Sequence, residues 1–209
     1  MSEVTTADAD VYLTVDRPTE FETKVKGSRF IGWARPVEDG AQAEAVLAEV
    51  RRTFHDATHH CYAFRIGWGP TLVLRASDGG EPAGTAGRPI LSAIEARGLT
   101  NTIVVVTRYF GGVKLGMGGL ARAYGQCAAE TLQRAGVRRC YVTRRLVVRA
   151  PHALHGALVH LVRQLQGQVV ASTFAQEATL VVTVRASRRE EFAQRVAELS
   201  AGQATVREA

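Results

Sequence analysis

The segment NTIVVVTRYFGGVKLGMGGLARAYGQCAAETLQRAG, residues 101–136, joins a β-branched run to a glycine-rich stretch and then to a long helical pattern. Residues 101–107 predict a strand buried on both faces, because apolar side chains occupy successive positions. Residues 120–135 predict a helix that Gly136 ends. Strand and helix in one segment favour a fold of the α+β class.

The chain before this segment alternates short strands with helices. Residues 1–19 lack periodicity and are expected to form a flexible leader. Asp39 is a suitable cap for a helix over residues 41–55, and Pro89 suits the first turn of a helix over residues 89–97. Strands are predicted at residues 20–25, 29–37, 61–68 and 71–76.

The chain after it begins a new pattern near residue 143. Strands are predicted at residues 143–149, 169–174, 178–185 and 203–207, and helices at residues 151–166 and 187–199. Ser187 is expected to cap the second helix. The resulting order, βαββαβ, is the ferredoxin-like pattern. We therefore expect a leader at residues 1–19, one domain at 20–139 and a ferredoxin-like domain at 143–209.

Bulk composition excludes several protein classes. The 209 residues are 46% apolar, but no stretch approaches the roughly 20 apolar residues of a membrane span. The acidic N-terminal stretch lacks a signal-peptide pattern, so we expect a cytoplasmic protein with no membrane partner. The three cysteines show neither metal-ligand spacing nor an even count, so neither a disulfide framework nor a cysteine-held metal is expected.

Positive charge is concentrated in the middle of the chain. Eleven basic residues and two acids lie between residues 88 and 149, which gives this segment a net charge of +9 within a total of +6. The basic residues are Arg88, Arg97, Arg108, Lys114, Arg122, Arg134, Arg138, Arg139, Arg144, Arg145 and Arg149. If they gather on one surface, a polyanion is the expected partner.

The glycine-rich stretch before the long helix suits an anion. Helix N-termini present free N–H groups, and small residues let a phosphate approach the backbone. The predicted phosphate- or nucleic-acid-binding residues are Arg108, Lys114, Gly116, Gly118, Gly119 and Arg122. Residues 116–121, GMGGLA, match the glycine pattern of a dinucleotide-binding fingerprint. However, the predicted strand ends at residue 107, too early for that fold, and no acid follows about 20 residues after the glycines. A P-loop lysine is also missing, so no cofactor is expected.

A second glycine-rich loop, SDGGEPAGTAGRPI at residues 77–90, carries two acids downstream of a pair of histidines, His59 and His60. One interpretation is a hydrolase or metal-dependent enzyme that uses the Asp78–Gly87 loop. The favoured interpretation is that Asp78 and Glu81 organise the loop by accepting hydrogen bonds from backbone N–H groups. No catalytic motif is present, and adjacent histidines on a strand face opposite ways. Neither a catalytic nor a metal-ligating residue is predicted.

Three motifs together resemble the YigZ/IMPACT family. They are ATHHCYAFRI at residues 57–66, SDGGEPAGTAGRPI at 77–90 and VVVTRYFGGVKLGMGGLARAYG at 104–125. The resemblance extends over roughly residues 20–205. It identifies a signature loop comprising Asp78, Glu81, Pro82, Gly84, Thr85 and Gly87. Gly79 departs from the family, which usually has an acid or asparagine there.

The resemblance implies a first domain similar to the second domain of ribosomal protein S-five, followed by a ferredoxin-like domain. The pair is similar to domains IV and V of elongation factor G. Eukaryotic IMPACT proteins regulate translation by competing for an activator of a kinase. The resemblance and the charge favour a non-enzymatic protein that binds RNA or the ribosome. Two alternatives remain. One is a protein-interaction module whose partner is a translation factor or regulatory protein, and the other is the enzyme that uses the Asp78–Gly87 loop. The oligomeric state stays open.

Overall fold

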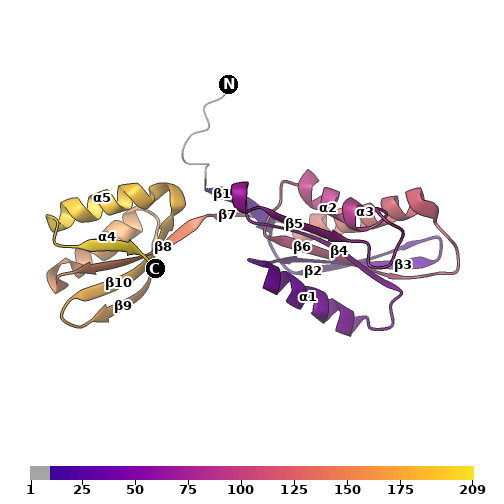
Figure 1. Ribbon diagram of the computed structural model, residues 1–209, viewed down its shortest axis with the longest axis horizontal. Coiled ribbons are helices and arrows are strands. Elements are labelled where there is room, and N and C mark those ends of the chain that lie inside the picture. Colours follow the sequence, from indigo (N-terminus) through magenta and orange to yellow (C-terminus); the bar gives the residue numbers. More distant parts are fainter. Residues whose placement is uncertain (1–9) are drawn as a thin grey trace, which may run out of the picture. The chain divides into compact units, whose positions relative to one another are not determined.

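The computed structural model describes residues 10–209, which form two compact units (Figure 1). The larger unit comprises Tyr12–Arg139. The smaller unit comprises Cys140–Ala209 together with Asp10 and Val11. No helix among residues 10–209 is both long and apolar enough to cross a lipid bilayer. The predicted two-domain α+β class is confirmed.

The larger unit is built on a five-stranded antiparallel sheet in the order β2-β3-β6-β4-β5. The strands are β2 (Thr19–Val25), β3 (Ser28–Pro36), β4 (His59–Ile66), β5 (Val73–Ser77) and β6 (Thr102–Tyr109). The central strand, β6, pairs with β3 and β4, and every residue before Tyr109 is buried. The predicted burial of this strand on both faces is confirmed.

Three helices cover the two faces of this sheet, α1 (Gly40–Thr53) on one and α2 (Gly87–Ala96) with α3 (Gly116–Ala135) on the other (Figure 1). Leu47 and Val50 of α1 pack against the sheet in one core. Leu132 of α3 lies in the second core with Phe30. Asp39 caps α1 as predicted, since its Oδ1 accepts a hydrogen bond from the N–H of Gln42 at 2.8 Å.

The prediction of a flexible leader is wrong for residues 10–19; residues 1–9 lie outside the described part of the chain. Strand β1 (Val11–Val15) pairs with β7 (Val137–Tyr141) in a two-stranded sheet, and β2 begins at Thr19. Val15 is fully buried, and the hydroxyl of Thr14 donates to the carbonyl of Asn101 at 2.9 Å. The run VYLTV at residues 11–15 has apolar side chains at alternate positions, which is itself typical of a strand.

The smaller unit has the predicted βαββαβ order. Its elements are β8 (Thr143–Ala150), α4 (His155–Gln164), β9 (Gln168–Phe174), β10 (Ala178–Arg185), α5 (Arg189–Ser200) and β11 (Thr205–Glu208). The sheet order is β11-β8-β10-β9, with all pairs antiparallel. The fourth, first, third and second strands of the unit therefore lie side by side, and the ferredoxin-like prediction is confirmed.

The start of α5 differs from the prediction. A short 3₁₀ turn, Ala186–Arg188, precedes the helix, and Ser187 makes no capping bond. Instead, the N–H of Ser187 donates to Oδ2 of Asp10 at 2.7 Å, and the N–H of Val142 donates to the carbonyl of Asp10 at 2.7 Å. Asp10 thus completes the smaller unit from the other end of the sequence.

Candidate functional site

Asp78 closes the signature loop between β5 and α2. Its carboxylate accepts three hydrogen bonds of 2.9 Å, from the N–H groups of Gly84, Ala86 and Gly87. Burial alone would raise the pKa of Asp78, but these three donors outweigh it and hold the pKa below its ordinary value. This is the role that the sequence favoured for Asp78. Within the loop, the hydroxyl of Thr85 also donates to the carbonyl of Pro82 at 2.7 Å.

Replacing Asp78 with asparagine is expected to destabilise the larger unit by about 1–3 kcal/mol near neutral pH, because hydrogen bonds to a charged acceptor are lost. The folded pKa of Asp78 is lowered, so its contribution is complete above the unfolded pKa and disappears as pH falls through the folded pKa. Urea unfolding at pH 7 and at about pH 3 should show the difference between parent and variant shrinking at the acidic pH. An equal difference at both pH values would contradict this account.

Glu81 has a different role from the predicted one. Its Oε1 accepts hydrogen bonds from Nη1 of Arg108 at 2.7 Å and from the hydroxyl of Tyr124 at 2.8 Å. The side chains of the ion pair are only 4% and 6% exposed. Nη2 of Arg108 donates to Oγ of Ser28 at 3.1 Å. The prediction that Glu81 binds the loop backbone is wrong, because its carboxylate forms an ion pair with the buried guanidinium of Arg108 instead.

The same ion pair corrects the role of Arg108. This residue was predicted to contact phosphate, but it is buried and its charge is balanced by Glu81. Its Nε finds no hydrogen-bond acceptor among the described residues. The guanidinium carbon lies 5.5 Å from the ring centre of Phe30 and 5.4 Å from that of Phe110. Arg108 is therefore part of the buried framework of the site and does not offer a free charge at the surface.

The two histidines face opposite ways, as expected for neighbours on a strand. Nδ1 of His59 lies 3.0 Å from the carbonyl of Gly79, whereas Nδ1 of His60 lies 3.1 Å from the hydroxyl of Thr107. Nε2 of His59 is 3.9 Å from Oε2 of Glu81. Across residues 10–209, no three or more His, Cys, Asp or Glu side chains group in a way that could hold a metal ion.

Cys61 lies beneath the signature loop, and its thiol donates to the carbonyl of Asp78 at 2.9 Å. Burial raises the pKa of Cys61 to about 12, so the thiol is protonated at neutral pH. Burial also raises the pKa of Tyr124, which keeps its hydroxyl as a donor to Glu81. The hydroxyl of Tyr124 thus stabilises the ion pair, whereas the thiol of Cys61 bonds to the loop backbone.

Helix α3 begins at Gly116, four residues earlier than predicted, so the glycines form its first turn. Gly116 adopts a φ of 69°, a left-handed value that favours glycine. Leu115 precedes the helix and supplies no side-chain acceptor. The first N–H groups of a helix have no partner within the helix. The first turn, with Gly118 and Gly119, thus presents backbone donors and no bulky side chain of its own except Met117.

A pocket of ≈ 360 Å³ opens beside this helix end. It lies within the size range of small-ligand sites. Its walls combine the buried ion pair with apolar side chains and one exposed cation; they are formed by Glu81, Pro82, Arg108, Phe110, Lys114, Leu115, Gly116, Met117 and Leu120. Phe110 and Met117, at 47% and 64% exposed, are the exposed large hydrophobic side chains of the pocket wall. The two glycine-rich stretches therefore meet at one pocket.

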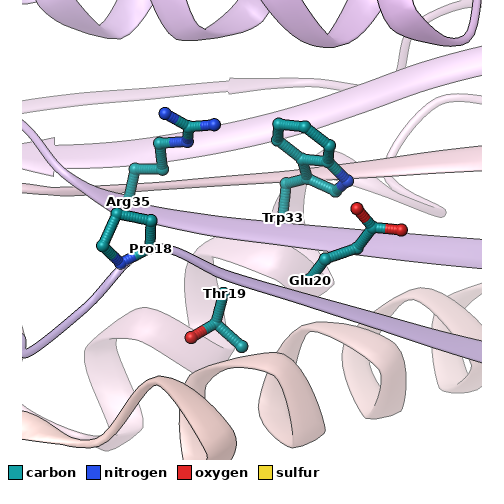
Figure 2. A pocket seen from close by; sticks show the side chains of 5 residues that line it. All are labelled: Pro18, Thr19, Glu20, Trp33 and Arg35. Carbon is teal, nitrogen blue, oxygen red and sulfur yellow. The ribbon is translucent and has the colours of Figure 1, made fainter.

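A second, smaller pocket of ≈ 170 Å³ lies on β2 and β3 (Figure 2). It is lined by Pro18, Thr19, Glu20, Trp33 and Arg35. The indole N–H of Trp33 is buried and has no acceptor among the described residues, while Arg35 pairs with Glu49 at 2.8 Å. This pocket contains none of the residues predicted from the sequence, and it is smaller than typical ligand sites.

The eleven basic residues do not all lie at the surface. Arg108 is internal, and Arg144, Arg145 and Arg149 belong to the smaller unit. Arg134 lies about 18 Å further along α3 than Arg122 and stacks over Phe21. Near the pocket, the exposed cations are Lys114 and Arg122, whose Nη1 lies 3.6 Å from the position a Cβ on Gly118 would take.

Sequence reasoning missed Tyr124 and Ser28, which complete the buried network, and it did not place Met117 on the pocket wall. Tyr124 stands on α3 and Ser28 begins β3, so neither is near Glu81 in the sequence. No motif marks a residue whose partner is found only after the chain folds.

Two family models match the chain. The Impact N-terminal domain matches residues 26–132, and a domain of unknown function, DUF1949, matches residues 148–203. The first match includes both glycine-rich stretches and every residue lining the larger pocket. The second match covers most of the ferredoxin-like unit.

Curated proteins and a solved structure agree with these matches. The chain is 33% identical to IMPACT family member YvyE of Bacillus subtilis, over 94% of this chain and 90% of that protein. It is 32% identical to IMPACT family member YigZ of Escherichia coli, over 88% and 91%. A crystal structure described as a hypothetical protein superposes with a TM-score of 0.73 at 30% identity, covering 96% of this chain and 98% of that one. The chain belongs to the IMPACT family.

Proposed function

We propose that this protein binds RNA or the ribosome in the regulation of translation, and that the pocket beside α3 holds one nucleotide. The observation that carries the proposal is the helix end itself. The glycine-rich first turn of α3 lacks a side-chain cap and adjoins a pocket lined by Lys114 and an exposed Phe110. Backbone donors, a cation and an aromatic ring are the groups that single-stranded RNA requires.

The phosphate and the base of a nucleotide each have a matching group in or beside the pocket. A phosphate would accept hydrogen bonds from the first N–H groups of α3, where the helix dipole also favours negative charge. Lys114 and Arg122 add positive charge to that end. A base would stack on Phe110, whose ring centre lies 5.4 Å from the guanidinium carbon of Arg108. Binding through phosphate and stacking is tolerant of sequence.

The alternatives are less well supported by the site. A hydrolase that used Glu81 would need that carboxylate to reach a substrate, but Arg108 and Tyr124 already occupy Oε1 and the side chain is 4% exposed. A protein-interaction module has one favourable observation, the exposed apolar side chains of Phe110, Val113 and Met117. The two charged residues beside them favour a polyanion over an apolar partner segment.

Removing the two cations is expected to weaken RNA binding roughly tenfold at about 50 mM salt. The full chain and its Lys114→Gln/Arg122→Gln variant should be titrated into fluorescein-labelled single-stranded RNA, with anisotropy as the readout, at about 50 and 200 mM NaCl. The slope of log affinity against log salt should fall by about 1.4, or 0.7 for each lost phosphate contact.

A matched control removes the same charge from the other side of the same unit. Arg51 and Arg52 are exposed in the last turn of α1, which covers the opposite face of the sheet from α3. The Arg51→Gln/Arg52→Gln variant should bind RNA nearly as well as the parent. Equal weakening in both variants, or no binding by the parent at low salt, would reject the site.

A further inference from the structure

Within the described residues of the smaller unit, both of its helices pack on the same face of the four-stranded sheet, so neither covers the other, open face. Helices α4 and α5 pack on the face where Leu146, Val148 and Leu180 lie in the core (Figure 1). Because side chains alternate along a strand, the residues between them project from the open face. On β10 the burial alternates strictly, so Arg185 belongs to this open face.

This open face is strongly basic. Arg145 and Arg149 project from β8, and the register places Arg185 of β10 opposite Thr143 and Arg207 of β11 opposite Val147. The remaining open-face positions of β10 are Thr179, Val181 and Thr183. Four arginines thus share one face with small, hydroxylated or apolar neighbours.

No acid balances these charges on the strands themselves. The only carboxylate on β8, β9, β10 or β11 is Glu208, which pairs with Leu146 and so falls on the helix side. Glu208 forms an ion pair with Arg189 at 3.0 Å. Within residues 10–209, no carboxylate lies within salt-bridge distance of Arg145, Arg149 or Arg207. Uncompensated like charges on neighbouring strands repel one another, so a polyanion would relieve this repulsion.

An aromatic ring completes the face. The guanidinium of Arg185 lies 3.7 Å from the ring centre of Tyr141, and Tyr141 is among the exposed large side chains. Threonine hydroxyls bind phosphate and sugar oxygens, and a stacked Arg–Tyr pair presents a flat surface to a base. An acidic protein would satisfy the charges but would leave this stacking surface without a partner.

We propose that the open face of the β11-β8-β10-β9 sheet is a second RNA-binding surface, which contacts the phosphates of a single strand through Arg145 and Arg149. The proposal rests on the proposed function, RNA binding, but not on the pocket beside α3. The two arginines are about 13 Å apart along β8, so they reach phosphates that are not adjacent.

The test compares two double variants of the full chain. Arg145→Gln/Arg149→Gln removes two charges from the open face. The control, Arg144→Gln/Arg163→Gln, removes two exposed charges from the same unit; Arg144 lies opposite buried Val184 on the helix side, and Arg163 is on α4. The open-face variant should bind single-stranded RNA roughly tenfold more weakly, with a salt slope lower by about 1.4, and the control should match the parent.

Crosslinking of RNA that contains 4-thiouridine, followed by mass spectrometry of the peptides, separates the two surfaces. Crosslinks at Tyr141 or on β8 and β10 support the open face. Crosslinks confined to Phe110 and the start of α3, with an unaffected Arg145→Gln/Arg149→Gln variant, overturn the open face and leave the proposed function intact. Crosslinks confined to the sheet would instead reject the pocket. A labelled polyglutamate peptide that binds as tightly as RNA, and loses binding in the same variant, would overturn RNA as the ligand.

Discussion

The Glu81→Gln variant is expected to lose about 3–5 kcal/mol of stability in the larger unit. Removing the carboxylate charge leaves the guanidinium of Arg108 buried without a counter-ion, and Nε of Arg108 already lacks an acceptor among the described residues. The hydroxyl of Tyr124 would also lose its charged acceptor. Breaking one side of a buried pair is costly because the remaining charge cannot regain its water.

Tryptophan fluorescence during urea unfolding measures this effect on the correct unit, because the chain's two tryptophans, Trp33 and Trp68, both lie in the larger unit. The control is Glu44→Gln, which breaks an exposed ion pair with Arg75 of 2.6 Å. Exposed pairs contribute at most about 1 kcal/mol. If the two variants unfolded at the same urea concentration, the buried pair would not have the importance assigned to it.

The Gly111→Ala variant is expected to destabilise the larger unit by at least about 1–3 kcal/mol. A Cβ at this position would overlap the carbonyl carbon and oxygen of Gly27 and the backbone nitrogen of Ser28. Backbone atoms cannot rotate away as a side chain can, so the turn between β2 and β3 or the loop after β6 must move. The N–H of Gly111 also donates to Oγ of Ser28 at 3.3 Å, which ties the loop to the buried network.

A second glycine in the same unit provides the control. A Cβ on Gly40, the first residue of α1, would meet no atom within 4 Å. Gly40→Ala should therefore leave stability unchanged or raise it by up to about 1 kcal/mol, because alanine restricts the unfolded chain. Thermal unfolding of the two variants side by side separates a steric effect from the general effect of adding a methyl group. Equal melting temperatures would contradict the predicted overlap.

Local patterns predicted most elements of the fold. The run at β6, the cap at Asp39 and the alternation along β10 are each visible in a few consecutive residues. The start of α3 was misplaced because glycine has low helix propensity, yet Gly116 and its neighbours take part in the helix. Strand β1 was not predicted, although its run VYLTV alternates apolar and other residues as a strand does.

The candidate site was only partly predictable from the sequence. Asp78 binds groups six to nine residues ahead, so its role could be inferred from the loop itself. Glu81 and Arg108 are 27 positions apart, and Glu81 and Tyr124 are 43 apart. A count of charges along the sequence treats Arg108 as free, whereas folding brings it beside the carboxylate that neutralises it.

Asp10 sets an order of events during synthesis of the chain. It leaves the ribosome early, but the N–H of Ser187 that it binds is made 177 residues later. At typical elongation rates of roughly 5–20 residues per second, that interval is on the order of ten seconds or more. The larger unit, residues 12–139, is fully synthesised before Asp10 can find that donor. The return of Asp10 to the smaller unit is therefore expected to follow the synthesis of the larger unit.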